Sequence, residues 1–339
     1  MKAAAGVTHD GFFAFFHMTP FMNHFRCICW SILCVSLVAS VTHAVASQNG
    51  RDFVLKFLYS FPQQPIRDLP LVDPQAIAND PEGNIFVVDT GNNRILQFDD
   101  NGKFIYSIGG FGFGSQQFDR PLDISAKNGL DIFIADYNNE RVERYDKNLN
   151  HISSFYSDEA LSRTLQFGFP LSVDISKHGE LFISDNENNR ILKVDSFGTP
   201  EQSFGGFNWG DGQLEYPVKL DLTSRDMVYV SDQGTDQIVV FDYYGNFIAQ
   251  FGQGVLNNPN GLAWKNNEIL FVADSGNNRI AVFDNNHKPI FFWGEQGQQI
   301  GAFNNPVDVA IYDHRIFVLD SGNQRVQVFE LNEVLQNDE

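Results

Sequence analysis

Apolar and polar positions follow the same order six times between residues 71 and 330. Each unit has an apolar residue three positions before a proline, then short apolar stretches, and then an aspartate five residues before an arginine or glutamine. These pairs are Asp89 and Arg94, Asp136 and Arg141, Asp185 and Arg190, Asp232 and Gln237, Asp274 and Arg279, and Asp320 and Arg325. The aspartates are 47, 49, 47, 42 and 46 residues apart, a spacing typical of β-propeller repeats.

Each unit predicts four short strands, which are clearest in the fifth unit at residues 261–264, 269–274, 280–284 and 290–294. The Gly/Asn-rich tip between the second and third strands predicts a β-hairpin. Most third strands carry an aromatic residue near their end, where it would pack between neighbouring blades. These residues are Phe98, Tyr145, Phe241, Phe283 and Phe329.

The last unit lacks a fourth strand, and residues 52–61 form a lone alternating segment before the first unit. We expect this segment to complete the last blade and close the ring, which leaves no open sheet edge at the seam. The sequence therefore predicts an all-β fold, a six-bladed β-propeller over residues 47–339. Its blades would lie near 71–109, 118–157, 167–205, 214–252, 256–294, and 303–330 plus 52–61.

The repeated unit resembles the NHL repeat, which has an apolar-x-x-Asp-x-Gly-Asn-x-Arg-Ile-x-x-Phe-Asp core. Residues 274–284 match it closely, and residues 89–99 and 320–329 match it well. The resemblance covers residues 71–330, departs at Ser157, Val194 and Gln237, and implies a six-bladed β-propeller. Some propellers of this type are zinc-dependent lyases, and related rings are calcium-dependent lactonases.

The N-terminal segment has the features of a secretory leader. An apolar run over residues 27–46 follows Arg26 and ends in a small-x-small site, which predicts cleavage after Ala46 and a secreted or periplasmic protein. Met22 as the start would give this signal peptide its usual proportions. An uncleaved membrane anchor is the alternative, since twenty residues can span a bilayer. All three cysteines lie in this segment (Cys27, Cys29 and Cys34), so the mature chain would contain no disulfide.

The net charge of −19 argues against nucleic acid as a partner, because an acidic surface repels phosphate. We expect a monomer that does not insert into a membrane after leader cleavage. The Asp and Arg of the repeat invite a catalytic interpretation, but six copies favour a structural role. Functional residues are therefore expected among the positions that vary between blades.

The first strand of each blade should line the central channel with alternate side chains. The positions two and four residues after the prolines would face it: Ala76, Asp123, Ser172, Lys219, Gly261 and Asp308, then Ala78, Ser125, Asp174, Asp221, Ala263 and Ala310. Calcium could be held by Asp123, Asp308, Asp174 and Asp221. In the favoured interpretation there is no cofactor, and Lys219 neutralises neighbouring carboxylates in a hydrated channel.

Zinc chemistry would require histidines that converge on the channel. The chain after residue 46 has only His151, His178, His287 and His314, all at or beside predicted turns on the side away from the Asp-to-Arg hairpins. No nucleophile elbow or histidine–carboxylate constellation is apparent either.

Three long loops lead into alternate blades, and two of them carry the aromatic residues Phe111, Phe113, Phe207 and Trp209. With Tyr137 they would lie on the face of the Asp-to-Arg hairpins, either packed locally or exposed for recognition. We therefore expect a module that binds a protein, peptide or glycan, rather than an enzyme. Its expected binding face comprises Asp123, Lys219, Asp308, Ser172, Trp209, Phe113 and Tyr137. The alternative is a cation-dependent hydrolase or lyase that uses the channel carboxylates.

Overall fold

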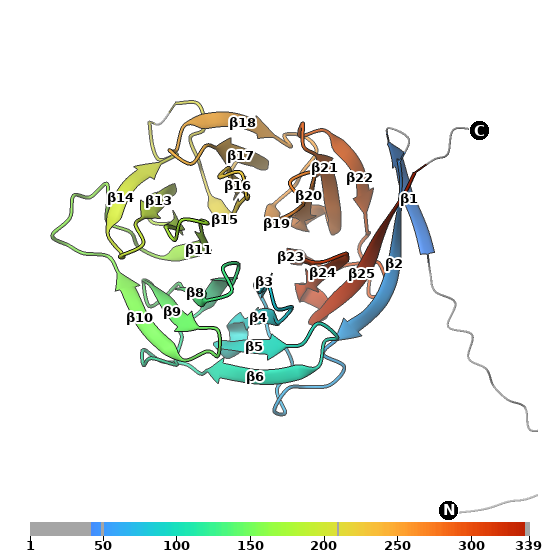
Figure 1. The fold of residues 1–339 in the computed structure, drawn as a ribbon, viewed down its shortest axis with the longest axis horizontal. Helices are drawn as coiled ribbons and strands as arrows, with labels where there is room; N and C mark the ends of the chain where they lie inside the picture. The colour runs from blue at the N-terminus through green and yellow to red at the C-terminus, as the bar shows by residue number, and fades with distance from the viewer. Residues whose placement is uncertain (1–41, 49–50, 209, 336–339) are drawn as a thin grey trace, which may run out of the picture. The chain divides into compact units, whose positions relative to one another are not determined.

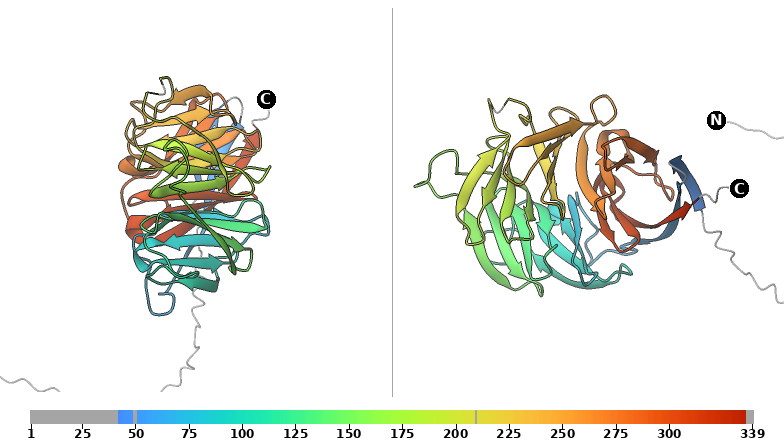
Figure 2. Two further views of the ribbon diagram at one scale, coloured as in Figure 1. Left: turned by 90° about the vertical axis from the view of Figure 1, so that its left-hand side faces the viewer. Right: turned by 45° about the horizontal axis from the view of Figure 1, so that its top comes forward.

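The computed structural model describes residues 42–48, 51–208 and 210–335. The predicted Met22 start, the leader up to residue 41 and Trp209 lie outside the described residues. The described chain forms six antiparallel sheets that follow one another around a ring (Figure 1). Figure 2 shows the same ring from the side. The prediction of a six-bladed, all-β propeller is confirmed.

Five blades have four strands each, in simple up-and-down order. Blade 1 consists of β3 (Ala76–Asn79), β4 (Ile85–Asp89), β5 (Arg94–Phe98) and β6 (Phe104–Gly109). Blade 2 consists of β7 (Pro121–Ser125), β8 (Asp131–Asp136), β9 (Arg141–Asp146) and β10 (His151–Tyr156). Blade 3 consists of β11 (Pro170–Ile175), β12 (Leu181–Asp185), β13 (Arg190–Val194) and β14 (Pro200–Phe204).

Blade 4 consists of β15 (Pro217–Leu222), β16 (Val228–Asp232), β17 (Gln237–Phe241) and β18 (Phe247–Phe251). Blade 5 consists of β19 (Pro259–Lys265), β20 (Ile269–Asp274), β21 (Arg279–Asp284) and β22 (Pro289–Trp293). Blade 6 combines β23 (Pro306–Tyr312), β24 (Arg315–Asp320) and β25 (Arg325–Leu335) with β2 (Arg51–Phe61) and β1 (Thr42–Gln48). Short 3₁₀ turns occupy the hairpin tips at Thr90–Asn92, Ser275–Asn277 and Ser321–Asn323.

The ring closes as the sequence predicts, because β2 pairs antiparallel with β25, from Phe61 opposite Val326 to Arg51 opposite Leu335. The structure adds a strand that the sequence did not predict: β1 pairs with the outer edge of β2. The expected cleavage after Ala46 falls within β1, so a chain cut there would keep only Ser47 and Gln48 of that strand.

The apolar core lies between blades, in six clusters that each join two neighbouring sheets. The aromatic residues predicted to pack there are buried, and Phe98 of blade 1, for example, lies 4.8 Å from Phe61 of β2 between ring centroids. Val194 fills the corresponding position between blades 2 and 3. Burial of so many large side chains stabilises the ring without disulfides.

The repeated Asp and Arg hold the loop that leads into their own blade. In blade 1, Asp89 accepts the Val72 N–H (2.7 Å) and the Arg94 Nε–H (2.6 Å), and Arg94 also donates to the carbonyls of Ile66 and Leu69. The neighbouring blade is contacted by the residue that follows the aspartate, since the Thr90 hydroxyl donates to the Pro121 carbonyl of blade 2.

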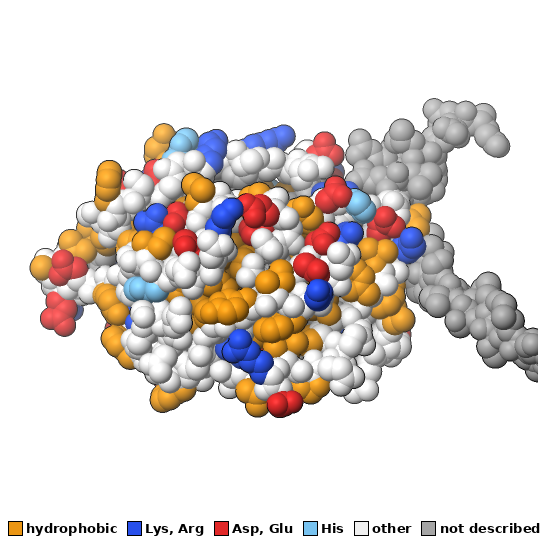
Figure 3. Space-filling view, turned by 60° about the horizontal axis from the view of Figure 1, so that its bottom comes forward, with side chains coloured by type: hydrophobic (Ala, Val, Ile, Leu, Met, Phe, Trp, Pro, Cys, Tyr) orange, Lys and Arg blue, Asp and Glu red, His pale blue; other side chains and the backbone are white. Residues whose placement is uncertain are grey.

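Antiparallel order gives the ring two distinct faces. We name the loop face after the loops between blades and the Asp-to-Arg hairpins, and the turn face after the turns between first and second and between third and fourth strands. Figure 3 brings the bottom of Figure 1 forward and shows hydrophobic side chains across the middle of the view. In this part of the ring the outermost strands, β6 and β10, expose Ile105, Tyr106, Ile152 and Tyr156.

Candidate functional site

The channel is filled on its loop-face side by a charged layer from the first strands. Lys219 of β15 donates its ammonium to Asp123 of β7 and to Asp308 of β23, the latter at 2.7 Å. Ser172 of β11 donates its hydroxyl to the other oxygen of Asp123. Asp123 and Asp308 are each 1% exposed. The structure thus brings together four of the residues that the sequence placed in one channel.

The carboxylates of this layer also join neighbouring blades through backbone hydrogen bonds. Asp308 of blade 6 accepts the Ile77 N–H of blade 1, and Asp123 of blade 2 accepts the Val173 N–H of blade 3, both at 2.9 Å. Gly261 completes the layer, since a Cβ there would lie 1.8 Å from Asp308 Oδ1. The charged layer is therefore part of what holds the blades at their spacing.

Burial and charge act in opposite directions on Lys219. Burial alone would lower its pKa, but Asp123 and Asp308 more than offset this and raise the pKa above its ordinary value. Burial raises the pKa of Asp308, and the Lys219 ammonium opposes that rise. At neutral pH the lysine is therefore charged.

A second charged layer lies closer to the turn face and is centred on Lys127, which the sequence analysis did not identify. Its ammonium donates to Asp174 of β11 at 2.6 Å, to Asp221 of β15, and to the Leu222 carbonyl at 3.3 Å. Burial would lower the pKa of Lys127, but the two carboxylates raise it. Lys127 lies six residues after Pro121, so one more step of the alternation that identified Asp123 and Ser125 reaches it.

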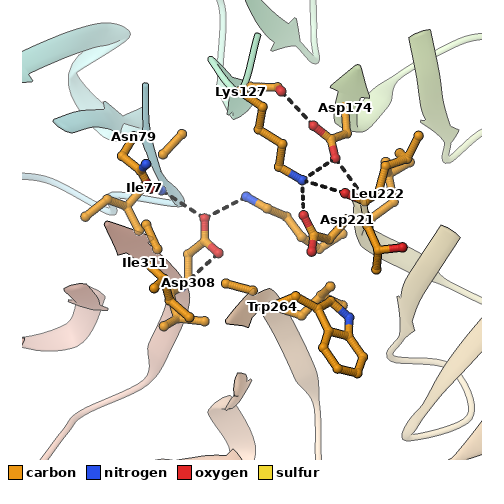
Figure 4. A pocket seen from close by; sticks show the side chains of 18 of the residues that line it. Ile77, Asn79, Lys127, Asp174, Asp221, Leu222, Trp264, Asp308 and Ile311 are labelled. Atoms are coloured by element: carbon orange, nitrogen blue, oxygen red, sulfur yellow. Dashed lines mark hydrogen bonds and ion pairs between the residues drawn. The ribbon is translucent and has the colours of Figure 1, made fainter. Parts of the chain in front are cut away.

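A cavity of about 370 Å³ lies on the turn-face side of these charged residues (Figure 4). Asp221, Asp308 and Lys127 line it together with Trp264, and its rim includes Pro81, Ser224 and Asn267 from turns between first and second strands. Burial raises the pKa of Asp221 to about 6, while Lys127 opposes the rise.

Calcium binding needs six or more oxygen ligands that can turn toward one ion. In the channel, Lys219 lies between Asp123 and Asp308, and Lys127 lies between Asp174 and Asp221. Among the described residues, no group of three or more His, Cys, Asp or Glu is arranged to hold a metal ion. An ion at either carboxylate pair would have to displace a lysine, so calcium stays a prediction.

The loop face carries the predicted aromatic residues in different environments. Phe111, Phe113 and Phe207 are 72%, 60% and 83% exposed. Tyr137 is partly buried, with its ring 5.3 Å from that of Phe169 and its hydroxyl bonded to Asn186. None of these four residues lines the channel cavity, which opens on the opposite face. The structure thus separates the residues of the expected binding face into a channel group and a loop-face group.

Comparison with known proteins finds two family matches within the ring. Residues 68–160 match a family described as a 6-bladed beta-propeller, and residues 303–329 match the NHL repeat. The chain is thus a six-bladed β-propeller with an NHL repeat in its last blade. The two matches fall on blades 1, 2 and 6 of this propeller, and in each of these blades the repeat arginine binds its aspartate.

One relative of this NHL propeller is the E3 ubiquitin-protein ligase NHLRC1 of Rattus norvegicus, which is 26% identical over 118 residues. That match covers 34% of this chain and 28% of the relative. Virginiamycin B lyase from Staphylococcus aureus has a similar fold, with a TM-score of 0.57, 14% identity, and coverage of 86% of this chain and 95% of the lyase. A gluconolactonase from Xanthomonas campestris gives a TM-score of 0.61 at 12% identity, with coverage of 86% and 96%. At these identities the two structures show the fold alone.

The four histidines that follow residue 46 lie on separate blades. His151 contacts Glu143 at 2.8 Å on blade 2, and His287 stacks on Phe251 with ring centroids 4.4 Å apart. His178 lies 3.8 Å from Asp226, and His314 lies beside Asp313 in the turn between β23 and β24. None of the four lines the channel cavity. No helix among the described residues is long and apolar enough to cross a membrane.

Proposed function

We propose that this NHL propeller is a secreted or periplasmic binding module that recognises a protein, peptide or glycan through its loop face. The supporting observation is the exposure of Phe111, Phe113 and Phe207 on loops that the scaffold holds in place. Exposed aromatic side chains are enriched at recognition surfaces, because they bury a large area at low cost in conformational entropy.

The Asp-to-Arg motif of blade 2 holds the loop that carries Phe113. Arg141 lies with its guanidinium carbon 4.6 Å from the Phe113 ring centroid and donates to the Phe113, Gly114 and Gln117 carbonyls. Asp136 in turn accepts the Arg141 Nε–H at 2.8 Å. A loop held by three such bonds loses little further entropy on binding, which favours affinity.

The experiment compares three forms of the protein as bait for material from the secreted or surface fraction. Wild type and Phe197→Ala should capture the same ligand, because Phe197 is 91% exposed but lies on the turn face. The double variant Phe111→Ala with Phe207→Ala should lose it. Identical capture by all three forms would contradict a role for the loop face.

The rival proposal is a hydrolase or lyase that uses a channel cation. Under the binding proposal, adding calcium leaves the melting temperature unchanged. A large calcium-dependent stabilisation that is lost in Asp123→Ala and in Asp308→Ala would favour the rival instead.

A further inference from the structure

Two cavities on the turn face join into one groove. The channel cavity of about 370 Å³ shares Lys127, Leu222, Thr223 and Ser224 with a second cavity of about 700 Å³. The second cavity lies over blades 2 and 3 and has Phe133 and Phe155 in its wall. The groove therefore leads from the channel axis to the outer part of the ring, on the face opposite Phe111 and Phe207.

At the inner end of the groove, Asp221 has an oxygen without a partner. Its Oδ1 accepts the Lys127 ammonium, but no donor among the described residues contacts Oδ2, although Asp221 is only 8% exposed. Asp123, by contrast, accepts bonds from Lys219, Ser172 and two backbone N–H groups. A carboxylate oxygen that lines a cavity and accepts no bond from the protein can accept one from a ligand.

The charges at the inner end favour a cation. The channel cavity is lined by four carboxylates, from Asp123, Asp174, Asp221 and Asp308, and by two ammonium groups, from Lys127 and Lys219. Lys127 uses its three ammonium protons on Asp174, Asp221 and the Leu222 carbonyl, so the ammonium has none left for an anionic ligand. The acidic chain, with a net charge of −19, would also attract a basic partner.

The outer end of the groove includes apolar side chains, and two of its cationic side chains are paired. Leu130 on its rim is 72% exposed. Arg144 binds both oxygens of Asp131 at 3.0 Å, and Lys177 lies 2.7 Å from Asp226. This part of the groove therefore suits apolar side chains and a neutral backbone rather than a second charge.

We propose that the groove binds an extended peptide segment of a partner protein, with a lysine or arginine side chain that reaches Asp221 in the channel. The basic group donates to Asp221 Oδ2, and its aliphatic stem lies along the channel wall. The adjoining residues lie over Leu130, Phe133 and Phe155. An extended chain advances about 3.3 Å per residue, so a few residues span the groove. This site is separate from the loop face.

The test uses acetylated and amidated pentapeptides with leucine or phenylalanine beside a central lysine, arginine or norleucine, in titrations by fluorescence polarisation. Lysine and arginine peptides should bind about tenfold tighter than the norleucine peptide, because norleucine keeps the stem and removes the charge. Asp221→Asn should abolish this difference. Leu130→Ser should weaken all three peptides, and Phe207→Ala on the opposite face should change none of them.

Equal affinity for the lysine and norleucine peptides, or unchanged affinity in Asp221→Asn, would overturn the proposal. If n-butylammonium binds as tightly as the lysine peptide, the channel is a small-amine pocket and the peptide assignment is wrong. The melting temperature of Asp221→Asn verifies that the variant is folded, and Leu130→Ser gives an independent result because Leu130 is exposed. The loop-face variants Phe111→Ala and Phe207→Ala leave this binding intact, so the two proposals fail separately.

Discussion

Replacing Lys219 by methionine tests the charged layer of the channel. Methionine keeps an unbranched stem but leaves Asp123 and Asp308, each 1% exposed, facing one another without a counter-charge. Removing one partner of a buried ion pair costs about 3–5 kcal/mol, which is a large share of the stability of a typical domain. Backbone donors from Ile77 and Val173 remain on the two carboxylates, so we expect the lower end of that range.

The loss should depend on pH. Without Lys219 the pKa of Asp308 rises further in the folded state, since burial already raises it and the opposing ammonium is gone. Between the lower pKa of the unfolded chain and the raised pKa of the folded state, the folded protein keeps a proton that the unfolded chain has released. The stability of the folded state therefore falls as pH rises through this range. Lys219→Met should therefore differ least from wild type at acidic pH and most at pH 7.

Urea unfolding at pH 4.5 and pH 7 measures both effects, with Lys147→Met as the control. Lys147 also pairs with a carboxylate, that of Glu82, but both side chains are about half exposed, so its replacement should have no measurable effect. Adding Asp123→Asn and Asp308→Asn to Lys219→Met should restore most of the stability. If Lys219→Met loses no more stability at pH 7 than Lys147→Met, the electrostatic account of the channel is wrong.

Two further predictions concern single positions. Gln237→Arg should raise the free energy of unfolding by about 0.5–2 kcal/mol. Gln237 donates only to the Thr235 carbonyl at 3.5 Å, whereas the arginines at this position in the other five blades bind their aspartates. A lower melting temperature would contradict this prediction. Burial raises the pKa of Asp221 to about 6 from an ordinary value of 3.8, so its contribution to stability falls as pH rises between these values. The stability of Asp221→Asn relative to wild type should therefore improve from pH 4 to pH 7 in urea unfolding, and a difference that does not vary with pH would refute the assignment.

The fold could be predicted from the sequence because the same pattern of residues recurs in all six units. Six prolines, six aspartates and the aromatic ends of the third strands set the strand boundaries independently, and residues 52–61 were left to close the ring. The strand β1 could not be predicted in this way. Residues 42–48 have no counterpart in the repeat, and their composition is that of a leader end.

The channel residues could be predicted from alternation, but the shape of the channel could not. The alternation of side chains along a strand identifies which of them point into the channel. The depth of the open channel depends on how far each of these side chains extends. Lys219 is long enough to span the axis between Asp123 and Asp308, and the cavity lies on the turn-face side of it. Lys127 reaches Asp174 and Asp221 of blades 3 and 4 from blade 2, a contact that no local pattern encodes.

Blade 2 departs from the shared pattern at a buried position, and both proposed binding surfaces adjoin it. Glu143 is fully buried where the corresponding residues of blades 1, 3, 4 and 5 are apolar: Leu96, Leu192, Val239 and Ala281. Its carboxylate lies 2.7 Å from Arg141, which also holds the loop of Phe113. On the channel side, the same blade supplies Lys127 to the turn-face groove. A buried charge is costly and is retained where its partners require it. The charged residues of blade 2 thus adjoin both proposed surfaces, whereas blades 1, 3, 4 and 5 carry apolar side chains at the position of Glu143.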